Sequence, residues 1–194
     1  MVWTQRGAIN LVFVSAKGKA GPRRQLFPAN KGYSSHVSLL WSGDQFGLFW
    51  QYWDRHRATL QVGKISAAGA VVAHRKVDET VESPSVVWNG ASYCVAWRNE
   101  SQVLFGLFSW AGTLRILSTV ASEADLRCAP KLVWRGGEYG FAWTERQTAN
   151  RVSYFARLSP AGKMRSKEQL GPPSHKNLLG LENIRTMRRA RSAP

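Results

Sequence analysis

The sequence predicts an all-β fold, and within that class a β-propeller of four-stranded blades with about 3.75 to 4 blades in the chain. Three observations support this prediction: a repeat of about 46 residues, paired tryptophans at fixed positions in each repeat, and abundant Trp, Val, Phe, Tyr and Gly. That composition is typical of strands joined by tight turns. The 194 residues then form either a four-bladed propeller or a fragment of a larger one.

The repeat is defined by two tryptophans nine positions apart, with a glycine turn and an aromatic residue between them. Three copies align without gaps, at residues 38–50, 85–97 and 131–143. Trp3 stands 47 residues before Trp50, so a fourth copy begins part-way through at the N-terminus. The repeated residues, which we expect to be structural, are Trp3, Trp41, Trp50, Trp88, Trp97, Trp134, Trp143, Gly43, Gly90 and Gly136.

One copy shows how the repeat is expected to fold. Residues 86–88 form a short apolar strand, and Asn89-Gly90 is a strong signal for a two-residue hairpin turn. Residues 93–97 alternate bulky and small side chains, as a strand between two packed layers does. Residues 103–108, a Ser-x-Ala-Gly turn and residues 113–117 complete four antiparallel strands, which we name a, b, c and d. A sandwich or an open array of hairpins is the alternative.

The repeats divide the chain as follows. Residues 1–170 are predicted to hold the propeller: a partial blade at 2–26 without strand a, then blades at 34–76, 83–119 and 129–168. Residues 171–194 are predicted to be a basic, mostly disordered tail. Residues 174–180 resemble 35–41 and are a candidate closing strand for the first blade, although Gly180 replaces the tryptophan.

The Trp-x-Gly…Tyr-x-Val-x-Trp…Ala-x-Gly pattern resembles the tandem β-propeller repeats of secreted and surface proteins of bacteria. It lacks the Gly-His and Trp-Asp pairs of WD40 repeats and the double glycine in every blade of kelch repeats. The resemblance implies a propeller and no particular activity. It implies an extracytoplasmic location if the chain is an N-terminally truncated piece of a longer protein. Because the first residues lack the features of a signal peptide, the compartment otherwise stays open.

The formal net charge of +15 raises polyanion or nucleic-acid binding as an alternative function. However, residues 163–194 hold eight of the 27 basic residues and only two of the 12 acidic ones. The repeated tryptophans also have a structural role, so nucleic acid is a possible partner but not the favoured one. No apolar run is long enough to span a membrane.

Variable loops on a rigid repeat are where binding usually occurs. Here the b–c loops vary in length and charge, and each carries arginine, which binds carboxylates, sulfates and phosphates through paired hydrogen bonds. Four blades would gather these loops around the mouth of a central channel. Ordinary solvated or ion-paired loop residues are the competing interpretation. The candidate ligand-binding residues are Arg6, Asp54, Arg55, Arg57, Arg98, Glu100, Glu145 and Arg146.

The sequence predicts no catalytic residue, metal site or cofactor. Propeller glycosidases need paired carboxylates at a working distance, and nothing in the sequence places two acids together. Cys94 and Cys128 form neither a disulfide framework nor a metal motif. The predicted function is therefore a non-catalytic binding or structural module whose protein or glycan ligand is unknown. Polyanion binding through the basic loops and tail is the first alternative, and glycan hydrolysis is the second.

Overall fold

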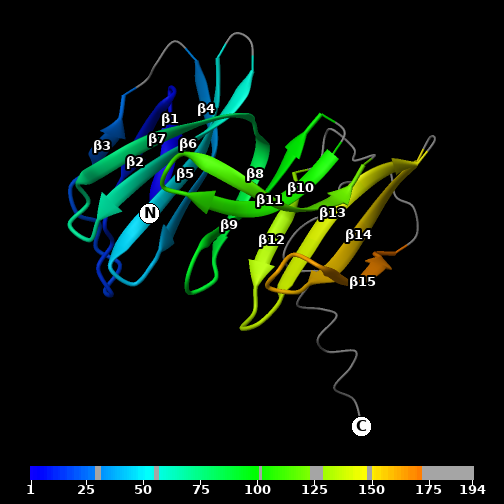
Figure 1. Cartoon of the computed structure of the whole chain (residues 1–194). Coiled ribbons are helices and arrows are strands. Elements are labelled where there is room, and N and C mark those ends of the chain that lie inside the picture. The colour runs from blue at the N-terminus through cyan, green and yellow to red at the C-terminus, as the bar shows by residue number, and fades with distance from the viewer. Residues whose placement is uncertain (29–31, 55–56, 101, 123–128, 148–149, 172–194) are drawn as a thin grey trace.

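A computed structural model of the chain describes residues 1–28, 32–54, 57–100, 102–122, 129–147 and 150–171. These residues form four antiparallel sheets, one of three strands and three of four (Figure 1). The fold class predicted from the repeat, an all-β propeller of four-stranded blades, is confirmed. Among the described residues, no helix has the length and hydropathy needed to cross a membrane.

Each sheet takes its strands in chain order. The first sheet contains β1 (Val2–Gln5), β2 (Ala8–Leu11) and β3 (Arg24–Phe27). The second contains β4 (Tyr33–Trp41), β5 (Gln45–Trp53), β6 (Ala58–Ser66) and β7 (Val71–Thr80). The third contains β8 (Glu82–Trp88), β9 (Tyr93–Asn99), β10 (Gln102–Ser109) and β11 (Thr113–Ala121). The fourth contains β12 (Lys131–Trp134), β13 (Tyr139–Gln147), β14 (Asn150–Leu158) and β15 (Met164–Gln169).

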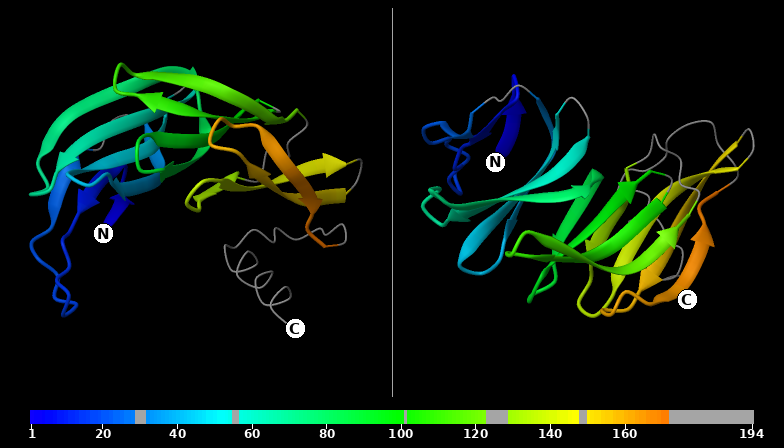
Figure 2. Two further views of the ribbon diagram at one scale, coloured as in Figure 1. Left: turned by 60° about the horizontal axis from the view of Figure 1, so that its bottom comes forward. Right: turned by 45° about the horizontal axis from the view of Figure 1, so that its top comes forward.

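The sheets follow one another in an arc, with the first and the fourth at opposite ends (Figures 1 and 2). The innermost strands make the contacts between sheets, because β8 touches β4 on one side and β12 on the other. The first sheet lacks an equivalent of these strands, and β1 contacts β4 instead. The candidate closing strand at 174–180 and nearly all of the basic tail lie outside the described residues.

The a–b hairpins turn at the glycines of the repeat. Gly43, Gly90 and Gly136 have φ values of 104°, 101° and 45°, the left-handed region in which glycine is favoured. In the third sheet the Asn89 side chain also holds the turn, since its Oδ1 accepts hydrogen bonds from the amides of Ala91 (2.9 Å) and Ser92 (2.8 Å). An Asn-Gly pair therefore supplies both the backbone freedom and the hydrogen bonds that this hairpin needs.

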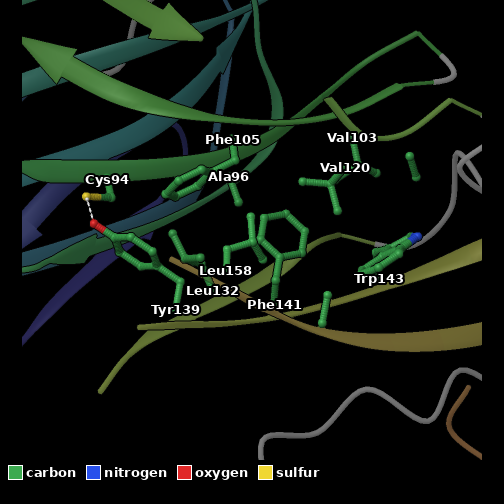
Figure 3. Close-up of a cluster of buried hydrophobic side chains, with 12 residues drawn as sticks. Cys94, Ala96, Val103, Phe105, Val120, Leu132, Tyr139, Phe141, Trp143 and Leu158 are labelled. Atoms are coloured by element: carbon green, nitrogen blue, oxygen red, sulfur yellow. Dashed lines mark hydrogen bonds between the residues drawn. The ribbon is translucent and has the colours of Figure 1, made fainter. Parts of the chain in front are cut away.

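The core consists of three layers, each between two neighbouring sheets. The strand-b residues alternate between them: Tyr93, Val95 and Trp97 of β9 pack against the second sheet. Cys94 and Ala96 of the same strand pack against the fourth sheet (Figure 3). Since side chains alternate across a strand, β9 and β13 each have one bulky and one small face, whereas β5 carries Phe49 on the face that receives Tyr93. The bulky face of each b strand packs against the preceding sheet.

The same contact recurs with different residues at successive junctions. We number the junctions in chain order, so the second junction lies between the second and third sheets and the third between the third and fourth. At the second junction the Tyr93 ring lies against Gly47, whose missing side chain leaves room for it. At the third junction Tyr139 occupies the equivalent position against Cys94, with its hydroxyl 2.9 Å from Sγ (Figure 3). Burial raises the pKa of the Cys94 thiol, which is therefore a packed, protonated group.

The two tryptophans of each repeat have different environments. The second ones, Trp50, Trp97 and Trp143, are at most 3% exposed and lie between sheets. Trp3, at the equivalent position of the first sheet, is half-buried under the Arg23 guanidinium, 5.5 Å from its ring centroid. The first tryptophans lie at the turn end of the junctions, where Trp41 is 46% exposed. The second tryptophans therefore belong to the core, while the first ones border it.

We expect Gly47→Ala to destabilise the fold by about 1–3 kcal/mol, because the new Cβ would lie 2.5 Å from Cζ of Tyr93 in a packed layer. Urea unfolding measures this change. The same substitution in a Tyr93→Leu background should cost much less, because the ring that it meets is gone. An unchanged unfolding midpoint for Gly47→Ala would show that the two sheets do not pack through this contact.

Candidate functional site

Two innermost strands carry a backbone irregularity at equivalent positions. His36 in β4 and Ser83 in β8 have φ values of 50° and 51°, which non-glycine residues uncommonly adopt. The pairing register shifts at the same places, between Ser35 and Ser38 and between Glu82 and Ser85. Bulges of this kind redirect side chains and concentrate near functional sites. They lie at the end of each strand away from the glycine hairpins.

The irregularities join three sheets through hydrogen bonds. The amide of Ser83 donates to Oε1 of Gln51 at 3.1 Å, and this glutamine in the second sheet is only 1% exposed. The amide of Leu132 in the fourth sheet donates to Oγ of Ser85 at 3.0 Å. Within the third sheet, the Arg98 guanidinium forms an ion pair with Glu82. The bulged segment of β8 thus links the second and fourth sheets.

Side chains from the same three sheets lie close enough at this position to influence the charge of His36. Burial lowers the pKa of His36, and the positive charges of Lys131 and Arg98 lower it further, against an opposing hydrogen bond with Gln51. His36 is therefore neutral near pH 7. Since Glu82 balances Arg98, Lys131 supplies a cationic charge that this pair does not offset. We call His36, Gln51, Glu82, Arg98 and Lys131 the inner-strand cluster.

Arg98 is one of the loop residues predicted to bind a ligand. Among those that the structure describes, it lies near a side chain of another sheet, because its charge acts on His36. The sequence suggested an exposed loop arginine, but Arg98 is 6% exposed. It follows Trp97 directly in β9 and therefore lies on the opposite face of the strand, where it forms an ion pair with the Glu82 carboxylate of the adjacent strand β8. This residue belongs to a candidate site, although by a different geometry from that of a solvated loop.

The acidic residues among the predicted set have local structural contacts. Oε1 of Glu145 accepts hydrogen bonds from Nε1 of Trp143 at 2.8 Å and from Nζ of Lys167 at 3.0 Å. Oδ1 of Asp54 accepts a hydrogen bond from the amide of Arg57 at 2.9 Å, which closes the b–c turn. These contacts account for both carboxylates without a ligand.

The remaining predicted residues lie apart from the cluster or outside the described chain. Arg6 and Glu100 are exposed and have φ values of 50° and 51°, as residues at the tips of tight b–c turns do. Arg55 lies outside the described residues, and the side chain of Arg146 does as well. Their roles as ligand-binding residues stay predictions.

Four cluster members, His36, Gln51, Glu82 and Lys131, were absent from the candidate set. One signal in the sequence points to this place: His36 and Ser83 each stand five residues before the first tryptophan of their repeats. A polar residue at that position marks the bulge. The pairing of Glu82 with Arg98 has no comparable signal, because it depends on the strand register. In the described part of the chain, no three His, Cys, Asp or Glu side chains are arranged to hold a metal ion.

The comparisons with known proteins show the fold and not a function. No family model matches the sequence, and the search of curated proteins finds no significant match. A solved structure that is similar is described as a subtype N10 neuraminidase-like protein of A/little yellow-shouldered bat/Guatemala/060/2010. The TM-score is 0.53 and the sequence identity 12%, over 71% of this chain. The neighbour is a six-bladed β-propeller, and the match spans 44% of its length.

The ion pair of the cluster can be tested by a double-mutant cycle. We expect Arg98→Met to destabilise the fold by about 2–4 kcal/mol, because it leaves the Glu82 carboxylate partly buried without its guanidinium. Adding Glu82→Gln should recover much of that loss, since the amide carries no charge. Chemical unfolding of the four proteins gives the coupling free energy. A coupling near zero would show that the two side chains act independently.

Proposed function

We propose that the chain is a non-catalytic binding module that uses the inner-strand cluster to bind an anionic group, such as the carboxylate of an acidic glycan. The observation that carries this proposal is the convergence of His36, Arg98 and Lys131 from three consecutive sheets beside two strained strand segments. Cationic groups held by a rigid scaffold attract anions without a large cost of ordering.

The hydrogen bonds of the cluster favour binding over structural packing alone. Gln51 and Glu82 hold Ser83 and Arg98 in place, so the scaffold is organised before a ligand arrives. His36 and Lys131 are exposed residues, although His36 is partly desolvated by its neighbours, so these two side chains are the groups available to a ligand. An anion would interact with the Lys131 ammonium, beside the buried ion pair of Arg98 and Glu82.

Glycan hydrolysis is less well supported by the described acids. Hydrolysis by the usual mechanism requires two carboxylates on either side of the scissile bond. Glu82 is paired with Arg98, Glu145 with Lys167, and Glu138 with Arg157 at 2.6 Å. Carboxylates committed to ion pairs are poor candidates for proton transfer to a sugar. The proposal therefore assigns recognition to the inner-strand cluster, whose carboxylate Glu82 is committed to Arg98.

Binding of oligogalacturonate, measured by isothermal titration calorimetry, tests the proposal. We expect Lys131→Gln to weaken the affinity about three- to fivefold, as removal of one exposed charge does. Lys163→Gln, at an exposed turn of the fourth sheet, is the matched control and should leave the affinity unchanged. Equal affinities for wild type and Lys131→Gln would contradict the assignment.

The affinity should also depend on pH through His36. Its pKa is lowered from 6.5, so it gains a proton and a positive charge only as the pH falls below that value. The affinity for oligogalacturonate should therefore rise as the pH is lowered from 7 toward 5. His36→Asn, chosen because asparagine tolerates positive φ, should remove the added rise. Because the pKa of His36 is lower in the folded state than in the unfolded chain, the unfolded chain binds the proton more readily. The contribution of His36 to folding stability should therefore decline as the pH falls below 6.5.

Deletion of residues 172–194 separates this function from polyanion binding by the basic tail. If the cluster binds oligogalacturonate, the shortened chain should bind it with most of its affinity. If the deletion abolishes binding and the binding falls steeply with salt, the tail is the polyanion site and the proposal is wrong.

A further inference from the structure

A hollow lies at the end of the sheets opposite the inner-strand cluster, beside the glycine hairpins. It has a volume of about 550 Å³ and lies at the junction of the second and third sheets. The a–b hairpins of both sheets and the c–d turn of the third sheet line it. Its lining includes the side chains of Ser42, Asp44, Trp88, Tyr93, Trp110 and Arg115.

The c–d turn of the third sheet departs from the repeat at this hollow. The turns that correspond to Ser109-Trp110-Ala111-Gly112 have Ala16, Ala67 and Pro160 where this turn has Trp110. Alanine and proline show that the turn needs no large side chain to form. Trp110 packs edge-on against Phe108 (5.3 Å) and Tyr93 (6.2 Å), so its indole is fixed at the wall of the hollow.

The hydroxyl of Tyr93 is the second feature of this hollow. At the third junction the equivalent Tyr139 hydroxyl accepts a hydrogen bond from Nδ2 of Asn89 at 2.8 Å. At the second junction Ser42 stands where Asn89 would. Its hydroxyl lies near Tyr93 but donates to the Gln45 carbonyl at 3.0 Å, and the Tyr93 hydroxyl has no hydrogen bond of normal geometry. Tyr93 is only 3% exposed, and a buried polar group without a partner is costly. Burial also raises the pKa of Tyr93, so its hydroxyl keeps its proton.

We propose that this hollow binds a neutral saccharide unit. A pyranose ring has a flat C–H face, which packs on indole rings, and a rim of hydroxyls, which donate and accept hydrogen bonds. Trp88 and Trp110 offer the flat walls, while Asp44, Ser42 and Arg115 offer charged and hydroxyl partners at the rim. A sugar hydroxyl would give Tyr93 the partner that Asn89 gives Tyr139. The Trp110 indole and the Tyr93 hydroxyl thus serve one site.

The charges of the hollow favour a neutral ligand over a cationic one. Aromatic walls with a carboxylate also suit ammonium groups. Here, however, Nζ of Lys64 already lies 5.6 Å from the Trp110 ring centroid, and Arg115 lines the same hollow. These two cations would repel a third. A purely apolar ligand is disfavoured as well, because it would leave the Tyr93 hydroxyl unsatisfied.

The test uses the whole chain and three neutral probes: maltohexaose, cellohexaose and chitohexaose. Calorimetry should detect binding of at least one at millimolar concentration, and Trp110→Ala should weaken it about tenfold by removing one indole wall. The repeat uses alanine at this turn in the first two sheets, so the variant should keep its fold. Trp53→Ala, at an exposed tryptophan of the other end, is the control and should bind normally.

Ser42→Asn provides a second readout that does not depend on saccharide binding alone. The new asparagine would stand opposite Tyr93 as Asn89 stands opposite Tyr139, and could donate a hydrogen bond to the Tyr93 hydroxyl. We therefore expect the unfolding temperature to rise while saccharide affinity falls. Absence of binding by all three probes would overturn the proposal, and so would equal binding by wild type and Trp110→Ala. Binding of tetramethylammonium with loss in Trp110→Ala would instead identify a cation site. Lys131→Gln should leave saccharide binding intact, which separates this site from the inner-strand cluster.

Discussion

The packing of each b strand between two sheets is the interaction on which the rest of the structure depends. A single four-stranded sheet exposes both faces and cannot bury its own apolar side chains. Here the bulky face of one b strand packs against the preceding sheet, with Trp97 and Trp143 fully buried at successive junctions. Replacing a buried tryptophan by alanine costs about 3–5 kcal/mol, a large share of the 5–15 kcal/mol of a whole domain. The junctions therefore determine whether the arc exists.

This constraint separates residues that serve the repeat from residues that do not. Gly47 and Cys94 differ in size, yet both receive a tyrosine of the next sheet, so the exchange leaves the architecture intact. Trp110 has no such equivalent, since the other three turns form with alanine or proline. Departures that packing does not require are the most informative positions in a repeat protein. They point to the hollow at the turn end, while the bulges at His36 and Ser83 point to the inner-strand cluster.

The fold was predictable from the sequence because the repeat records local physics. The spacing of Trp41, Trp88 and Trp134 reports the length of a sheet, and Asn89-Gly90 reports the hairpin. The cluster was much less predictable. Arg98 was selected as a loop residue, but its burial follows from the register that brings Glu82 opposite it. Histidine is enriched among residues with positive φ, but the bulge at His36 depends on how β4 pairs within the assembled sheet. Long-range register and strain are properties of the assembled sheets.

Native-state hydrogen exchange tests the packing between sheets most directly. Trp97 belongs to β9 of the third sheet but packs against the second sheet, which contains β5. If that packing couples the sheets, Trp97→Ala should lower the protection of amides in β5 by about as much as those in β9. Loss of protection confined to β9, with β5 unchanged, would show that each sheet is stable by itself and would contradict the account.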